Sequence, residues 1–364
     1  MIHMNKTGKK AYLSNEAVTA LTEWYKQAKR DLPWRDTGDP YDVWLSEIML
    51  QQTRVEAVKE RFIQFRNELP DIASLAECDD ERLMRLWEGM GYYSRARNLK
   101  KCAQVLVQDY DGKLPEDPEL LKKLPGIGPY TAGAISSIAY SRAVPAVDGN
   151  VLRVMTRLYG MEDDIRNEQT KRKIEDIIAA YFDSAPLPCR VSDFTQAWME
   201  LGALVCMPNG APACNECPLS EMCRAHLDNR TDEIPCRSPL KQRKVIRKTI
   251  LVIRDGSHFL LHKRPDTGLL AGLYEFPSID RFLTRDEALE EVRKLGFDPL
   301  QIHVLPDAKH IFTHLEWHMH AFEIMTAGSL SCPENCILAD KRDLAGRAIP
   351  NAFQVYKDYY SLRD

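Results

Sequence analysis

The spacing of apolar residues divides the chain into a long helical region and a shorter mixed region. Between about residues 15 and 225, apolar positions recur three and four residues apart, for example over 16–29, 43–66 and 172–182, which is the period of amphipathic α-helices. From residue 249 the pattern changes, and two β-rich runs flank Asp255-Gly256, a dipeptide typical of a hairpin turn. A helical stretch over 284–296 and a strand-like stretch over 316–325 follow. We therefore expect an all-α region followed by an α+β region.

The segment between these regions has the composition of a connector. Residues 231–248 contain two prolines and a run of basic residues, which indicates a linker. The expected domains are thus 1–230, which is helical, and 249–364, which is α+β. A length of 364 residues is enough for two hydrophobic cores.

Overall composition restricts the function classes only loosely. The chain is 44% hydrophobic and 28% charged, as is normal for a globular protein, and its formal net charge is −4. Any binding to nucleic acid must therefore depend on local basic patches. We find neither an apolar run long enough to span a membrane nor the apolar core of a secretory signal at the N-terminus. We expect a cytoplasmic protein of the bacterial type.

Four of the ten cysteines are crowded into one short segment. Cys206, Cys214, Cys217 and Cys223 have the spacing C-x7-C-x2-C-x5-C, and four thiolates can hold either a tetrahedral zinc ion or an iron–sulfur cubane. Zinc ribbons usually carry two separated C-x2-C pairs, whereas this chain has one. The spacing therefore favours an iron–sulfur cluster over zinc, and metal binding over disulfides.

The stretch "LPGIGPYTAGA" at 124–134 interrupts a helical pattern and restarts it at once. Pro125 suits the end of one helix and Pro129 the first turn of the next. Gly126 and Gly128 permit unusual backbone conformations and close approach of a partner, and N–H groups at a helix N-terminus bind phosphate oxygens. This pattern predicts a helix–hairpin–helix that grips the DNA backbone. A plain corner between two helices, with glycine caps, is the alternative.

Two carboxylates in the helical region are candidates for acid–base chemistry. Glu47 lies in an apolar helical stretch, where it either faces solvent or occupies a pocket that raises its pKa. Asp148 precedes a helical run, where it can cap the helix and be kept ionised by the helix N-terminus. No histidine occurs between residues 4 and 225. A neutral Glu and a charged Asp are the pair that cleavage of a glycosidic bond requires.

A basic segment with aromatic residues adds a candidate nucleic-acid contact. Residues 82–101 carry six basic residues against one acidic residue, and Tyr92 and Tyr93 follow Gly91. Aromatic side chains beside cations suit insertion into a base stack. A solvated helix face with two buried tyrosines is the alternative.

Taken together, these motifs make the chain resemble the MutY adenine DNA glycosylases of the helix–hairpin–helix superfamily. The matching stretches, in family order, are "DLPWR", "PYDVWLSEIMLQQTRVE", "WEGMGYYSRARNL", "PGIGPYT", "PAVDGNV", "LGALVC", "RPDTGLLAGLYEFP" and "HIFTHLEWH". The resemblance covers nearly the whole chain. It implies an all-α helix–hairpin–helix glycosylase domain with an iron–sulfur cluster loop at 206–223, followed by an α+β Nudix-like domain.

The resemblance also implies an activity and a set of site residues. The family removes adenine mispaired with 8-oxoguanine or guanine in double-stranded DNA, without cutting the strand. Glu47 would protonate adenine N7 and activate water, Asp148 would stabilise the oxocarbenium ion, and Tyr130 would orient these groups. The four cysteines would hold one [4Fe–4S] cluster.

Further positions carry over to the extruded adenine and to the lesion. The residues expected around adenine are Arg30, Trp34, Arg35, Leu50, Val55 and Gln196. Gln52 and Tyr92 would wedge into the duplex, while Phe312, Thr313 and His314 would read 8-oxoguanine. The expected partner is lesion-containing DNA, bound by a monomer.

The sequence departs from the family pattern at three places. Seven residues separate Cys206 from Cys214 where many members have six, and Thr313 replaces a serine. The second domain also lacks the glutamate-rich box of active Nudix hydrolases, so we interpret it as a recognition module.

Three other functions remain to be separated from this one. An endonuclease III-like lyase needs an amine to form a Schiff base, and such enzymes carry lysine at the place of Tyr130. A non-catalytic iron–sulfur sensor would leave Glu47 and Asp148 without a task. A nucleotide-pool hydrolase would need the missing glutamates.

Overall fold

A computed structural model describes residues 13–184, 186–239, 242–265, 267–328, 332–347 and 349–361. The first twelve residues of the expected helical domain and residues 240 and 241 of the expected linker lie outside this set. The chain forms two compact units. The first comprises residues 1–78 and 98–239, and the second comprises 79–97 and 240–364.

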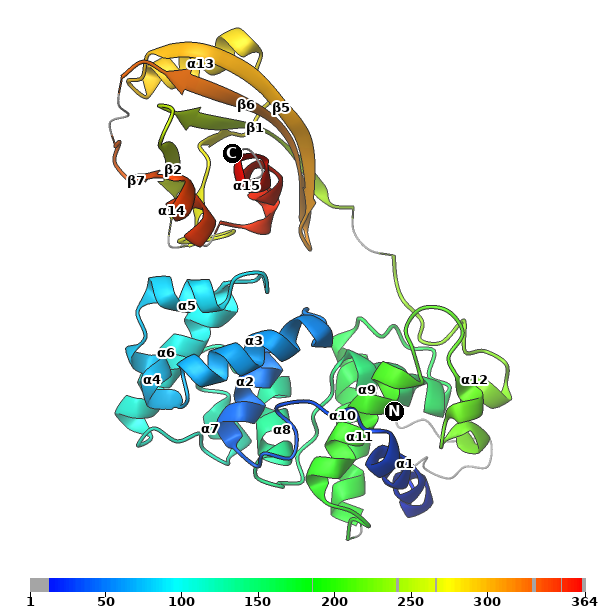
Figure 1. Ribbon diagram of the computed structural model, residues 1–364. Helices are drawn as coiled ribbons and strands as arrows, with labels where there is room; N and C mark the ends of the chain where they lie inside the picture. Colours follow the sequence, from blue (N-terminus) through cyan, green and yellow to red (C-terminus); the bar gives the residue numbers. More distant parts are fainter. Residues whose placement is uncertain are drawn as a thin grey trace. The chain divides into compact units, whose positions relative to one another are not determined.

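The first unit is built from helices (Figure 1). Its α-helices are α1 (Asn15–Ala28), α2 (Pro40–Leu50), α3 (Val55–Glu68), α4 (Ile72–Glu77), most of α6 (Ser94–Asp109), α7 (Pro118–Leu121), α8 (Pro129–Ile138), α9 (Gly149–Tyr159), α10 (Glu168–Ser184), α11 (Val191–Leu204) and α12 (Arg224–Leu227). Two short 3₁₀ helices, η1 (Cys214–Glu216) and η2 (Ser220–Met222), precede α12. No strand occurs among the described residues of this unit, which agrees with the helical periodicity.

A continuous apolar core joins α1, α9, α10 and α11. Fully buried side chains from the four helices include Leu21, Met155, Ile174 and Trp198. An N-cap residue marks the start of α1, where the Ser14 side chain accepts a hydrogen bond from the Ala17 N–H. This core holds α9 and α11, which carry several residues of the site described below.

The apolar pattern over 43–66 is divided between two helices rather than forming one. Helix α2 ends at Leu50 and α3 begins at Val55, and between them Gln52 has a φ of 58°. A left-handed backbone at a residue with a Cβ is strained and interrupts the helical hydrogen bonds. Apolar spacing could not reveal this break, because the period resumes in phase on the other side.

The second unit contains a seven-stranded sheet. Its strands are β1 (Lys244–Arg254), β2 (Phe259–Lys263), β3 (Tyr274–Glu275), β4 (Ser278–Ile279), β5 (Pro299–Ile311), β6 (Leu315–Thr326) and β7 (Cys336–Ala339), and its helices are α5 (Asp80–Leu86), α13 (Arg285–Lys294), α14 (Lys341–Gly346), η3 (Asn351–Phe353) and α15 (Gln354–Ser361). The main strand order is β3-β2-β1-β6-β5. The expected hairpin is confirmed, since Arg254 pairs with Phe259 across the Asp255-Gly256 turn.

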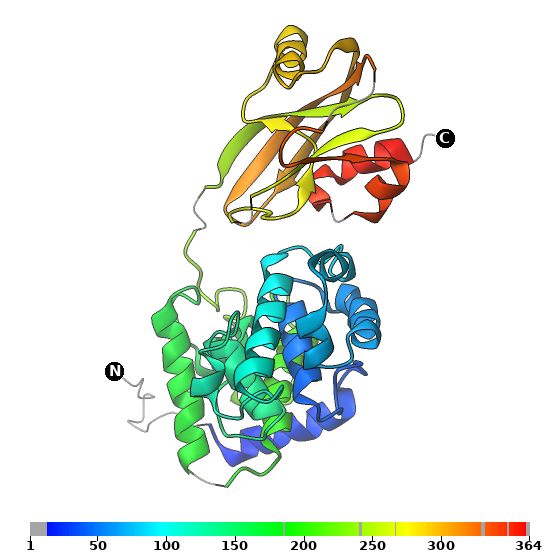
Figure 2. The same cartoon turned by 90° about the vertical axis from the view of Figure 1, so that its left-hand side faces the viewer.

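Helices cover both faces of this curved sheet (Figures 1 and 2). On one face Ala288 and Val292 of α13 pack on Leu251 and Phe322. On the other face η3, α14 and α15 pack on strand residues that include Trp317. The expected helix over 284–296 is confirmed as α13, which starts with a capping box at Thr284.

Strand β1 begins inside the segment expected to be linker. Its first residues, Lys244 to Lys248, pair in parallel with Leu315 to Met319 of β6. Lys244, Arg247 and Lys248, which belong to the basic run that suggested a solvated connector, therefore lie in an ordered strand. None of the described helices is long and apolar enough to cross a membrane.

Candidate active site

A cavity of about 420 Å³ in the first unit collects most of the residues singled out from the sequence. It is lined by the three expected catalytic residues, by all six residues expected around adenine, and by Gln52. These residues come from α2, α3, α8, α11 and the loops before α2, α3 and α9. Positions from Arg30 to Glu200 in the sequence therefore meet in one place.

Glu47 occupies the pocket alternative rather than the solvent-facing one. Its side chain on α2 is buried, and burial raises its pKa to about 7, with a smaller contribution from the charge of Asp148. The Tyr130 hydroxyl donates a 2.5 Å hydrogen bond to Glu47 Oε2, and this hydrogen bond acts to lower the pKa of Glu47. The pKa of Tyr130 is itself raised by burial and by Glu47, so the phenol remains a donor. A carboxyl with this pKa can give up a proton near neutral pH.

Asp148 is the N-cap of α9, as the sequence suggested. Its Oδ1 accepts a 2.7 Å bond from the Val151 N–H, and Oδ2 accepts a 2.7 Å bond from Asn150 Nδ2. Burial raises the pKa of this carboxyl, while the hydrogen bonds from Val151 and Asn150 act to lower it. The helix N-terminus therefore favours the carboxylate, as expected, but burial opposes it.

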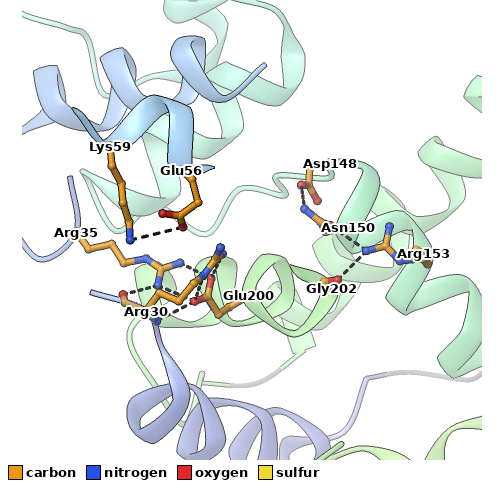
Figure 3. A network of polar contacts seen from close by, with 9 residues as sticks. All are labelled: Arg30, Arg35, Glu56, Lys59, Asp148, Asn150, Arg153, Glu200 and Gly202. Carbon is orange, nitrogen blue, oxygen red and sulfur yellow. Dashed lines mark hydrogen bonds and ion pairs between the residues drawn. The ribbon is translucent and has the colours of Figure 1, made fainter. Parts of the chain in front are cut away.

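Glu200, which the sequence did not single out, is the second buried glutamate of the cavity. Figure 3 shows the Arg30 and Arg35 side chains converging on it, with Arg30 Nη2 2.7 Å and Arg35 Nη2 2.6 Å from Glu200 Oε2. Burial acts to raise its pKa, but the hydrogen bonds from both arginines outweigh burial and hold the pKa at about 2. In the sequence, Glu200 lies within the apolar helical stretch "AWMELGAL". This is the pattern that singled out Glu47, and it could have identified Glu200 as well.

A polar chain leads from Asp148 toward the cysteine segment (Figure 3). Asn150 donates to Asp148, and its Oδ1 accepts a 2.9 Å bond from Arg153 Nη2. Arg153 also donates to the carbonyl oxygens of Gly202, at 2.8 Å, and of Cys206, at 2.7 Å. A side chain on Gly202 would collide with Asn150, because a Cβ there would lie 2.5 Å from the Asn150 Cβ. The first cysteine of the cluster motif is thus tied to the loop that orients Asp148.

The four clustered cysteines lie along one turn-rich segment between α11 and α12. Burial raises the pKa of Cys217 to about 12 and also raises the pKa values of Cys214 and Cys223, and repulsion from neighbouring thiolates adds to this. The Arg157 guanidinium donates to Cys206 Sγ at 3.2 Å. Such buried thiols need a metal to be held as thiolates.

Four cysteines are a donor set that either a zinc ion or an iron–sulfur cluster can use. Within the described part of the chain, no three His, Cys, Asp or Glu side chains are grouped as one metal ion would require.

The hairpin at 124–134 shows two different uses of glycine. Gly126 has a φ of 77°, and a Cβ there would lie 2.7 Å from the Asn98 Cβ, so both conformation and space require glycine. Gly128 has a φ of −89°, so the expectation that its conformation is closed to other residues is wrong. A Cβ on Gly128 would meet nothing within 4 Å, which leaves its surface open to a partner.

The residues expected at the lesion are divided between the units. Gln52 lies in the first unit, whereas Tyr92, Phe312, Thr313 and His314 lie in the second. Tyr92 is 46% exposed with a φ of 48°, while Tyr93 is buried, so the alternative of two buried tyrosines applies to Tyr93 alone. The Tyr92 hydroxyl is 2.9 Å from Thr313 Oγ1.

Comparison with known proteins places both regions in known families. A model of the HhH-GPD superfamily of base excision DNA repair proteins matches residues 45–180, and a NUDIX domain model matches residues 249–358. A thermostable thymine-DNA glycosylase of known structure is similar with a TM-score of 0.52 and 27% identity, over 58% of this chain and 95% of that one. The expected fold class is thus confirmed for both regions.

Curated relatives extend the similarity over nearly the whole chain. The adenine DNA glycosylase of Mus musculus is 32% identical over 403 residues, covering 93% of this chain and 77% of the mouse protein. The adenine DNA glycosylase of Buchnera aphidicola subsp. Baizongia pistaciae is 33% identical over 309 residues, covering 84% of this chain and 85% of its own. The chain therefore belongs to the adenine DNA glycosylases, a family of DNA repair enzymes.

Proposed function

We propose that this enzyme hydrolyses the N-glycosidic bond of adenine mispaired with 8-oxoguanine or guanine in double-stranded DNA and leaves the strand uncut. The observation that carries the proposal is the cavity in which Glu47, Tyr130 and Asp148 meet. No lysine occurs among the described residues that line this cavity. A strand-cleaving lyase needs such an amine.

Glu47 is the proposed general acid. Adenine is a poor leaving group until N7 is protonated, and a carboxyl with a pKa of about 7 holds a proton in a useful fraction of molecules at neutral pH. After the bond breaks, the resulting carboxylate can accept a proton from the attacking water. The hydrogen bond from Tyr130 fixes the rotamer of Glu47 through both stages.

Asp148 is the proposed stabiliser of the cationic sugar. Its hydrogen bonds from Val151 and Asn150 hold the carboxylate in place. A fixed negative charge lowers the energy of the oxocarbenium ion without reorganisation during the reaction. A transient covalent bond between Asp148 and the sugar is compatible with this arrangement.

The target adenine must leave the duplex stack to reach Glu47. We propose that it enters the cavity among Arg30, Trp34, Arg35, Leu50, Val55 and Gln196. Because adenine itself is undamaged, selectivity has to come from the opposite base. The turn Phe312-Thr313-His314 is proposed to read 8-oxoguanine, with Gln52 and Tyr92 wedged into the duplex and Gly126 and Gly128 on the backbone.

Cys206, Cys214, Cys217 and Cys223 are proposed to hold one [4Fe–4S] cluster. When bound, the cluster would cross-link the segment between α11 and α12 and fix the Cys206 carbonyl that Arg153 binds. The extra residue between Cys206 and Cys214 lies in a loop with one glycine and two prolines, where an insertion is tolerated. Since the substrate is chromosomal DNA, we propose a monomer that acts on the nucleoid in the cytoplasm.

Single-turnover excision of adenine from duplexes with 8-oxoguanine, guanine or thymine opposite adenine tests the proposal. We expect fast release opposite 8-oxoguanine and guanine and little release opposite thymine. Asp148→Asn should abolish excision and leave duplex binding largely intact. Equal rates with all three opposite bases would refute the assignment of substrate.

Two further assays separate the alternative functions. Borohydride should not trap the enzyme on abasic DNA, whereas a lyase would be trapped through its Schiff base. No pyrophosphate should be released from nucleoside triphosphates, because the second unit lacks the glutamates of active Nudix enzymes.

A further inference from the structure

One face of the sheet in the second unit is covered by α13 over only part of its length. Leu251 of β1 and Phe322 of β6 lie beneath α13. Nearer the turn between β5 and β6, a groove runs along β1 instead, lined by Lys244, Arg247, Asp280, Arg281, Phe282 and His318 among others. Its residues on β1 belong to the end of the strand that enters the sheet beside β6.

The strand register places two basic side chains and a histidine in a row across this face. Arg247 of β1 is paired with His318 of β6, and His318 is paired with Lys309 of β5. Paired residues on neighbouring strands point to the same side of a sheet. In the next row toward the turn, Val245 and Ile311 flank Glu316, and both apolar side chains are about half exposed.

Charges in and around the groove leave a local excess of positive charge. Lys248 binds the Asp280 carboxylate, Lys309 lies 3.1 Å from Glu316, and Arg281 is paired with Glu287. In contrast, neither Lys244 nor Arg247 forms an ion pair with a described residue. These two cations are therefore available to an anion, although the whole chain has a net charge of −4.

An exposed aromatic ring stands beside these cations. Phe282 is 47% exposed, and the Arg247 guanidinium lies 5.8 Å from the centre of its ring. Phe282 also contacts His320, which fixes the ring at the groove wall. A phenyl ring held beside cations offers an apolar surface to a sugar next to phosphate-binding groups.

One residue of the groove, Lys244, is bonded to the turn proposed to read 8-oxoguanine. Lys244 is opposite Leu315 in the strand register, and its N–H is directed to the carbonyl oxygen of His314. A DNA strand whose base is read at this turn would continue along a groove of this kind.

We propose that this groove binds the phosphodiester backbone of duplex DNA. Lys244 and Arg247 would contact phosphates, and Phe282 would contact a deoxyribose next to Arg247. The groove would add affinity without sequence information, because phosphate contacts orient a protein on DNA and base contacts specify the site. The choice of DNA rests on membership of the family, whereas the proposed opposite-base selectivity is not needed for it.

The test is binding of the full chain to an undamaged fluorescent duplex, measured by anisotropy over a salt series. In Lys244→Gln/Arg247→Gln we expect binding about tenfold weaker at 0.1 M salt and a salt slope lower by about 2, as for two lost phosphate contacts. The matched control Arg293→Gln/Arg342→Gln removes two exposed charges outside the groove and should change affinity less than about twofold. Lys244→Arg/Arg247→Lys keeps the charges and should bind as the unmodified enzyme does.

Three results would overturn the proposal. The first is a groove variant that binds undamaged DNA like the control variant. The second is loss of binding in the charge-conserving variant at an unchanged melting temperature. The third is weakening confined to lesion duplexes, which would make the groove a reader of the lesion. Weaker binding to undamaged DNA in an enzyme that ignores 8-oxoguanine would refute the proposed function but not the groove.

Discussion

Two buried glutamates at the same cavity have opposite electrostatic environments. Glu47 has a pKa raised to about 7, mainly by burial, whereas Glu200 has a pKa held at about 2 by two arginines. Tyr130 gives Glu47 one neutral donor, while Arg30 and Arg35 give Glu200 two charged ones. Burial alone is thus not enough to make a proton donor: the partner decides whether the buried carboxyl keeps its proton.

The difference assigns separate tasks to the two ends of the cavity. Glu47 changes its protonation state near neutral pH and suits chemistry. Glu200 remains ionised and suits the positioning of Arg30 and Arg35, whose guanidinium groups would otherwise repel each other at the cavity wall.

Glu47→Gln should have the largest effect on the reaction. An amide cannot deliver the proton, and general acid catalysis contributes about 10²–10⁴-fold. We expect single-turnover adenine excision to fall by about 10³-fold or more. Glu60→Gln, on the exposed side of α3, is the control and should be neutral. A Glu47→Gln enzyme with more than a tenth of the normal rate would place the acid elsewhere.

Glu200→Gln should have its largest effect on stability. Removing one partner of a buried ion pair costs about 3–5 kcal/mol, and the partial exposure of Arg30, 28%, reduces this to about 2–4 kcal/mol here. Urea unfolding at pH 7 measures the change. Glu233→Gln, which removes an exposed partner of Arg230, should cause no measurable loss of stability, because solvent screens this pair. A loss of stability no larger than that of the control would mean that the ion pairs of Glu200 with Arg30 and Arg35 contribute nothing to the free energy of unfolding.

Stability should depend on pH in opposite ways at the two glutamates. The folded-state pKa of Glu47 lies above its ordinary value of 4.5. The contribution of Glu47 to the free energy of unfolding is therefore fully present below about pH 4.5 and is lost as the pH rises through 7. One pKa unit corresponds to about 1.4 kcal/mol. Between pH 4.5 and pH 8, the free energy of unfolding of Glu47→Gln should therefore rise by up to about 3 kcal/mol relative to that of the unmodified enzyme. Glu200 contributes stability above its ordinary pKa, and this is lost as the pH falls toward 2. Unfolding curves at pH 4.5, 6 and 8 test the first trend, and a constant difference would contradict it.

Tyr130→Phe should have the smallest effect. It removes the donor that favours ionised Glu47, so the pKa of Glu47 should rise by about one unit. The descending limb of the pH–rate profile for excision should therefore move to higher pH by about the same amount. An unchanged limb would mean that the bond to Tyr130 does not influence the proton.

Much of the fold follows from local sequence features. Capping residues such as Asp148 and Thr284 mark helix starts, and Asp255-Gly256 marks the hairpin. The break at Gln52 and the start of β1 at Lys244 could not be predicted, because the first depends on a strained backbone and the second on pairing with β6, far along the chain.

The candidate site divides in the same way. The motifs identified Glu47, Asp148, Tyr130 and the four cysteines, and the cavity brings the first three together. They did not identify Glu200, Asn150 or Arg153, whose roles depend on contacts across the fold. Likewise Gly126 and Gly128 look alike in the sequence, and only the backbone angles distinguish them.

The sequence by itself determined the family, the order of the elements and the residue types available for chemistry. It placed both Glu47 and Glu200 in apolar helical stretches, and there the two are indistinguishable. Tertiary structure distinguishes them, because Arg30 and Arg35 reach Glu200 from 170 and 165 positions away, whereas Glu47 meets the phenol of Tyr130. A pKa is set by the charges and donors within a few ångströms, and folding selects those neighbours from distant parts of the chain.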